Sequence, residues 1–188
     1  MEKVHIIQEL VQHHQHFIHT LESLSDADFQ RKPGEKWRAG QQLEHIIKSV
    51  KPVNMAFGLP MFVLKMKFGT ANRPSRSYEA LVEKYLRVLE EKQDYVLPDR
   101  FAPEEIPLKR KGQKLKELTG LVQKLTSRLA KVTEEGLDTH ILPHPVLGKL
   151  TLREMLYFTM YHVQHHDKQI LENLNTLKNA EKSRSPKS

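Results

Sequence analysis

The sequence contains no cysteine. Disulfide bonds, thiolate metal ligands and a cysteine nucleophile are therefore excluded, and the composition suits a reducing compartment. Long apolar runs are missing too: the most apolar stretch, residues 53–68, is interrupted by Gly58 and Pro60 and is too short to span a membrane. The first residues show no apolar segment of the kind found in secretory signals. We expect a cytoplasmic protein without a transmembrane segment.

Glycine is scarce as well. Only 8 glycines occur in 188 residues, whereas Leu, Lys, Glu and Gln are frequent, and this composition favours helices over sheets. No stretch shows the alternation of apolar and polar residues that is typical of a half-buried strand. The length fits one domain with a sizeable core. The predicted fold class is all-α.

Apolar residues three and four positions apart predict amphipathic helices. The predicted helices cover residues 3–24, 38–57, 77–95, 114–135 and 151–174. Thr151 and Glu154 have the spacing of a capping box, and Gly136 follows the fourth helix as a C-terminal cap would. The pattern predicts a four-helix bundle with long connections and an extra helix or irregular insertion between the second and third bundle helices. We expect the bundle domain over residues 1–175 and a disordered basic tail over 176–188.

The formal net charge of +7 raises the question of nucleic-acid binding. The positive excess is concentrated in residues 109–114 and in the tail. No predicted helix carries a row of Arg and Asn that could contact base edges. The charge pattern therefore disfavours a nucleic-acid partner.

Histidine, in contrast, is abundant, with 11 residues. His162 and His166 share the edge of the apolar stripe of the last predicted helix, and their spacing of four places the two rings on successive turns. Such a pair can offer two nitrogens to one metal ion, or it can be a pair of buried structural histidines. The segment has no Glu after its first His, so the zinc-protease mechanism lacks its general base.

The other histidines carry weaker signals. Of His13, His14, His16 and His19 in the first helix, only His14 shares the apolar stripe, so packing or solvent exposure is favoured over ligation for these four. His140 and His144 lie beside prolines in a turn-rich segment and could line the mouth of a pocket.

Helical periodicity does not single out His45. This residue lies about 120° from the centre of the apolar stripe of its helix, which favours an exposed position. Glu44 and Asp167 adjoin histidines in the sequence but project in other directions around their helices, so a surface role is favoured for both. No general base can be named from the residues.

Three segments carry distinctive combinations of residues. They read Trp-Arg-Ala-Gly-Gln-Gln-Leu-Glu-His over 37–45, His-Pro-Val-Leu-Gly-Lys-Leu-Thr-Leu-Arg-Glu-Met over 144–155, and His-Val-Gln-His-His-Asp-Lys-Gln-Ile over 162–170. In order, spacing and predicted helix position they resemble the DinB/YfiT-like family, and the resemblance covers about residues 3–174. One departure is Arg38, since many relatives have Ser at this position as a helix cap.

The resemblance implies a four-helix bundle in which His45, His162 and His166 bind one divalent metal ion, in the first place zinc or nickel. Some relatives are transferases that use low-molecular-weight thiols, and others are described as metal-dependent hydrolases. Three protein ligands leave a coordination position open, which is typical of a reactive metal site.

The leading hypothesis is therefore a metal-dependent enzyme of the transferase or hydrolase type. It would act on a small molecule after the metal activates water or a low-molecular-weight thiol. Two alternatives stay open: a binding or stress-response module whose metal only stabilises the fold, and a metal-free helical interaction protein. The apolar stretch 53–68 and the habit of the family both suggest a homodimer.

Overall fold

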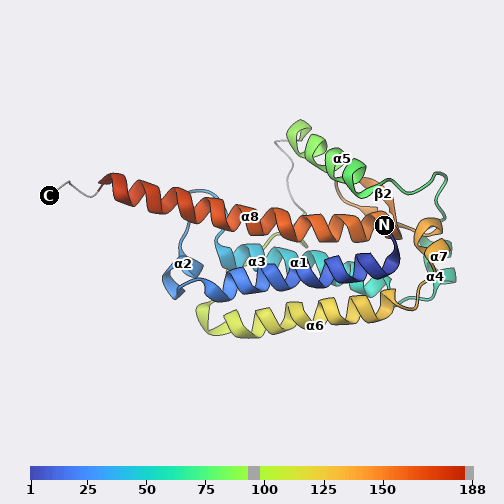
Figure 1. Cartoon of the computed structure of the whole chain (residues 1–188), viewed down its shortest axis with the longest axis horizontal. Helices are drawn as coiled ribbons and strands as arrows, with labels where there is room; N and C mark the ends of the chain where they lie inside the picture. Colours follow the sequence, from blue (N-terminus) through green and yellow to red (C-terminus); the bar gives the residue numbers. More distant parts are fainter. Residues whose placement is uncertain (93–97, 185–188) are drawn as a thin grey trace.

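The computed structural model describes residues 1–92 and 98–184, with side chains as far as residue 179. Four long helices form a bundle (Figure 1), in which α1 and α3 each pack against both α6 and α8. This arrangement confirms the predicted all-α fold and the four-helix bundle. The bundle helices are α1 (Lys3–Ser23), α3 (Ala39–Ala56), α6 (Lys111–Leu129) and α8 (Leu152–Arg184).

Helix α1 shows why these segments become helices. Its buried residues Ile6, Leu10, His14, Phe17 and Leu21 recur every three or four positions, which makes one continuous stripe. The other bundle helices present similar stripes, and the side chains meet in one core.

Shorter elements connect the bundle helices. The insertion expected between the second and third bundle helices consists of α4 and α5, and α5 packs against α8. No helix among the described residues is both long and apolar enough to cross a membrane. The shorter elements are α2 (Asp26–Gln30), α4 (Met61–Phe68), α5 (Tyr78–Glu91), the 3-10 turn η1 (Leu108–Arg110) and α7 (Glu134–Thr139).

The chain also contains two short strands that the sequence pattern did not predict. Strands β1 (Ile141–His144) and β2 (Gly148–Thr151) form an antiparallel hairpin in which His144 pairs with Gly148. Gly148 has a φ of +77°, a left-handed conformation that glycine adopts without steric penalty. Strands of four residues are too short to give a periodic signal in the sequence.

Two helix ends also differ from the prediction. Helix α6 ends at Leu129, and Gly136 lies inside α7, where its amide donates to the Thr133 hydroxyl that caps that helix. Helix α8 continues beyond the predicted end at residue 174 to Arg184, so residues 176–184 are helical rather than disordered. Residues 185–188 of the expected tail, and 93–95 of the third predicted helix, lie outside the described residues.

The start of α8 agrees with the sequence. The Glu154 amide donates to the Thr151 hydroxyl over 3.1 Å, and the Thr151 amide donates to the Glu154 carboxylate over 3.0 Å. This reciprocal pair confirms the predicted capping box. At α3, where Arg38 replaces the expected Ser, the Arg38 amide donates to the side chain of Gln41 instead.

Candidate metal centre

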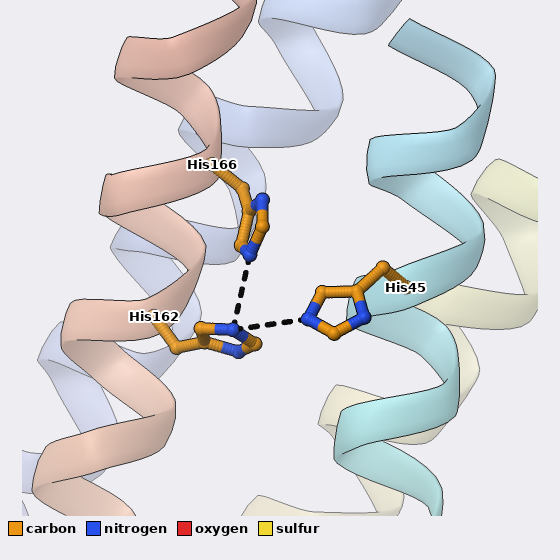
Figure 2. A group of neighbouring side chains, drawn as sticks. All are labelled: His45, His162 and His166. Atoms are coloured by element: carbon orange, nitrogen blue, oxygen red, sulfur yellow. Dashed lines mark hydrogen bonds between the residues drawn. The ribbon is translucent and has the colours of Figure 1, made fainter. Parts of the chain in front are cut away.

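Helices α3 and α8 bring three histidine rings together. His45 extends from α3 toward His162 and His166, which lie on successive turns of α8 (Figure 2). The Nε2 atom of His162 lies 3.2 Å from that of His45 and 3.0 Å from that of His166. Among the described residues this is the one group of three or more potential ligands that converges so closely, with all ligand atoms within 4.8 Å.

All three rings are buried, with residue exposures of 5%, 6% and 5% for His45, His162 and His166. The exposed position that periodicity favours for His45 is therefore wrong. Helix α3 packs against α6 on one side and against α8 on another, so most of its circumference is covered. The apolar stripe marks only part of that covered surface.

Hydrogen bonds fix the orientation of two of the rings. His45 Nδ1 lies 2.9 Å from the carbonyl oxygen of Phe101, and His166 Nδ1 contacts the side-chain oxygen of Gln42. A carbonyl oxygen can only accept, so each Nδ1 must carry the proton and donate it. The Nε2 atoms of His45 and His166 therefore present lone pairs toward His162.

The three Nε2 atoms do not carry enough protons to form both of these contacts as hydrogen bonds. His162 Nε2 can donate at most one hydrogen, yet it faces two nitrogens that can only accept. At least one of the two contacts must then bring two lone pairs together. A cation bound by all three nitrogens removes the conflict. Metal–nitrogen bonds of about 2.0–2.1 Å separate tetrahedral ligand nitrogens by roughly 3.3 Å, close to the 3.2 and 3.0 Å that separate His162 Nε2 from the other two nitrogens. The donor set thus fits a divalent ion.

The rings are also in the protonation state that a metal ion requires. Burial lowers the pKa of His45 below its usual value and lowers the pKa of both His162 and His166 well below it. The neighbouring imidazoles act in the same direction for the two α8 histidines. Neutral imidazole is the form that ligates, so a metal ion would displace no proton at pH 7.

A chain of amides leads away from the centre. Gln42, which accepts from His166, donates in turn to Gln169 over 3.3 Å, and the Gln169 amide lies 2.8 Å from His165 Nε2. At each of these three contacts a donor can face an acceptor. The chain fixes both the tautomer and the angle of the His166 ring, as outer partners of metal-binding histidines commonly do.

Aromatic rings enclose the three histidines. Trp37 stacks against His166 with ring centroids 6.0 Å apart, and Phe158 stacks against His162 at 4.7 Å. The rings line a cavity of about 1160 Å³ to which all three histidines contribute, together with Tyr85. This volume is enough for a small organic molecule beside the histidines.

Two acidic residues differ from the expected surface role. Glu44 is 7% exposed and its carboxylate lies 2.7 Å from the ammonium group of Lys114. Asp167 is also 7% exposed and its carboxylate lies 3.3 Å from His16. Neither lines the cavity. Both are buried because α3 and α8 are covered on several sides, and neither supplies the missing general base.

Three other histidines differ in burial and in their position relative to the cavity. His14 is buried in the core, as its place on the apolar stripe predicts, and its Nδ1 lies 2.7 Å from the Leu10 carbonyl oxygen. His144 lines the cavity, whereas His140 does not. The sequence analysis missed Gln42, although its position three residues before His45 places it on the same helical face.

Fold and site together define a helical-bundle protein with a buried cluster of three histidines. The chain belongs to the DinB superfamily, because the model of this family matches residues 9–170. The uncharacterized protein YuaE of Bacillus subtilis (strain 168) is 29% identical over 158 residues, which cover 81% of this chain and 86% of YuaE.

The fold is also similar to a solved structure, that of YfiT from Bacillus subtilis. YfiT is described as a probable metal-dependent hydrolase with an unusual four-helix bundle topology. The TM-score is 0.60 at 20% sequence identity, and the match covers 94% of this chain and 88% of that chain. The similarity supports the four-helix architecture inferred from the sequence.

Proposed function

We propose that this protein is a metal-dependent enzyme of the hydrolase or thiol-transferase type, in which His45, His162 and His166 bind one divalent ion. The observation that carries the proposal is the convergence of three buried Nε2 atoms on the wall of a cavity that can hold a small molecule. Zinc and nickel are the first candidates because the family resemblance implies them, and imidazole is a suitable ligand for both.

The side chains around the proposed ion have different roles. The three histidines, which line the cavity, would hold the ion, while Gln42 and the Phe101 carbonyl hold two of the rings in place. When bound, such an ion lowers the pKa of a coordinated water or thiol and so supplies a nucleophile near neutral pH. Trp37 and Phe158 stack against two of the rings and line the same cavity, so a substrate in it would lie against apolar surface beside the ion.

One comparison and one sequence resemblance support the proposed reaction class. The description of YfiT as a probable metal-dependent hydrolase concerns a protein with the same fold. The sequence motifs resemble a family in which some members use low-molecular-weight thiols. A small-molecule substrate agrees with a cavity of about 1160 Å³.

The proposal is tested first by metal analysis of untagged protein, followed by reloading with zinc or nickel. We expect about one ion per chain, and we expect His162→Ala to lose it while the control His19→Ala, on the exposed side of α1, keeps it. Hydrolase and thiol-transferase substrates are then screened with the same variants. A chain that binds no metal on reloading contradicts the proposal, and turnover that survives His162→Ala rules out metal-centred chemistry.

The same proposal includes a homodimer in the cytoplasm. Met55, Phe62 and Met66 expose 72%, 70% and 79% of their surface near the junction of α3 and α4, and a second copy could cover them. The absence of cysteine suits a reducing compartment and a thiol cosubstrate. Sedimentation that shows only a 22.0 kDa species contradicts the dimer.

A further inference from the structure

His144, at the end of β1, has a feature that the metal centre does not use. Its Nδ1 atom lies 3.1 Å from the amide nitrogen of Val146 and 3.0 Å from that of Leu147. Both amides can only donate, so Nδ1 must be the unprotonated nitrogen. In the neutral ring the single proton then resides on Nε2.

The His144 ring is held at the wall of the cavity. It packs edge-on against Phe158 with centroids 4.2 Å apart, and Phe158 in turn stacks against His162 at 4.7 Å. The turn whose amides donate to Nδ1 is held in place as well. Leu147 is buried, and its carbonyl oxygen accepts from the ammonium group of Lys84 over 3.1 Å. One aromatic ring thus separates a fixed N–H donor from the metal centre.

Other roles for His144 fit these contacts poorly. A general base needs a free lone pair, and the lone pair of Nδ1 is already shared by two amides. A general acid needs an imidazolium, but burial lowers the pKa of His144 to about 4, so the ring is neutral at pH 7. A ligand role is excluded for Nε2 as long as it carries the proton.

We propose that His144 is a substrate-binding residue whose Nε2–H donates a hydrogen bond to an oxygen atom of the substrate, such as a carbonyl, carboxylate or phosphoryl oxygen. The inference rests on the proposed function, because it places the substrate in the cavity beside His162. It deepens that function by naming the group recognised: a hydrogen-bond acceptor several ångströms from the atom that meets the metal.

The tautomer can be tested without any substrate. Long-range proton–nitrogen NMR spectra of labelled protein at pH 7 distinguish the two neutral tautomers, and the signals of His144 are those lost in His144→Asn. We expect a protonated Nε2 and an unprotonated Nδ1. A proton on Nδ1 overturns the proposal, whatever the fate of the metal site.

The hydrogen bond is tested by ligand binding to the cobalt-loaded protein. The probes are mercaptoacetate, 3-mercaptopropionate and 4-mercaptobutyrate, whose carboxylates reach different distances from a metal-bound sulfur, and ethanethiol, which has no acceptor. His144→Asn keeps an oxygen that can accept from the turn amides but lacks the Nε2 donor. We expect it to weaken at least one carboxylate probe about tenfold and to leave ethanethiol unchanged.

His140→Asn provides the matched control, because His140 directly precedes β1 and does not line the cavity. Its affinities should equal those of the wild type. Equal losses for all four probes in His144→Asn, or no loss for any, overturn the proposal. Failure of the wild type to bind cobalt, or to give a thiolate absorption band with any probe, instead contradicts the proposed function.

Discussion

The buried imidazole of His14 should make the fold sensitive to acid in a measurable way. The ring lies inside the stripe of α1 that faces the core, is 1% exposed, and bonds through Nδ1 to the Leu10 carbonyl. Its Nε2 has no hydrogen-bond partner within the described part of the chain. Burial lowers the pKa of His14 from 6.5 to about 4.

The magnitude follows from proton linkage. Between pH 6.5 and pH 4 the unfolded chain binds a proton at this residue and the folded chain does not, so the free energy of unfolding falls as the pH falls. The slope approaches about 1.4 kcal/mol per pH unit, and the whole interval amounts to about 3 kcal/mol. Above pH 6.5 both states are neutral and the full contribution is present.

The assay is urea unfolding of metal-free wild type and His14→Leu at pH 7.0, 5.5 and 4.5. Leu fills the site without an unpaired nitrogen, so the two proteins should differ by about 1 kcal/mol or less at pH 7. At pH 4.5 the wild type should have lost about 2–3 kcal/mol more than the variant. The other buried histidines are present in both proteins and cancel in the difference.

His19→Gln is the matched control, because an exposed ring on the same helix is hydrated in both the folded and the unfolded chain. Its stability should follow that of the wild type at every pH. Parallel pH profiles for wild type and His14→Leu would show that His14 does not stay neutral in the folded chain, and the reasoning from burial would fail.

Three further predictions concern the metal centre and the segment that leads into α5. Gln42→Leu removes the acceptor for His166 Nδ1, so zinc affinity measured by chelator competition should fall about 10–100-fold with the fold intact. Burial lowers the pKa of all three candidate ligands, so zinc affinity should change less than about fivefold between pH 7.5 and 6.0. Histidines with an ordinary pKa near 6.5 would lose roughly fiftyfold, and such a loss would contradict the buried geometry. Glu154 is 0% exposed and accepts from Arg73 over 2.6 and 2.8 Å, so Glu154→Gln should cost about 2 kcal/mol and lower Tm by about 4–8 °C in calorimetry. An unchanged Tm would mean that the ion pair between Glu154 and Arg73 contributes nothing to stability.

The sequence predicts well those features that depend on neighbours along the chain. Apolar spacing gives the bundle helices to within a few residues except at the C-terminal ends of α6 and α8, and the Thr151–Glu154 spacing gives the start of α8. The spacing of four between His162 and His166 is likewise a local property, since it places both rings on one face of one helix.

Features that depend on packing between distant segments are harder to predict. His45 lies off the apolar stripe of α3, and its burial comes from α8 and from the Phe101 segment, far away in the sequence. The covered side of α3 that faces the cavity includes polar residues such as Gln42, which apolar periodicity does not detect. Only the resemblance to a family, and not the pattern of the residues, indicated His45.

His14 and the three-histidine cluster show two different reasons for burying an imidazole. In the part of the chain that the structure describes, the one hydrogen-bond partner of the His14 ring is the Leu10 carbonyl, which can still accept the helical backbone bond within α1 if a leucine of similar size replaces the histidine. At the cluster, removal of His166 would leave the Gln42 oxygen without its donor, and removal of His45 would do the same to the Phe101 carbonyl. Those same contacts aim two lone pairs at a third nitrogen and thereby create a repulsion that apolar packing would avoid. Packing of a metal-free core does not require polar groups in this arrangement, whereas a bound cation would satisfy all three Nε2 atoms at once. The proton mismatch therefore favours a metal-binding role over the metal-free interaction protein, and reloading of the untagged chain decides between the two.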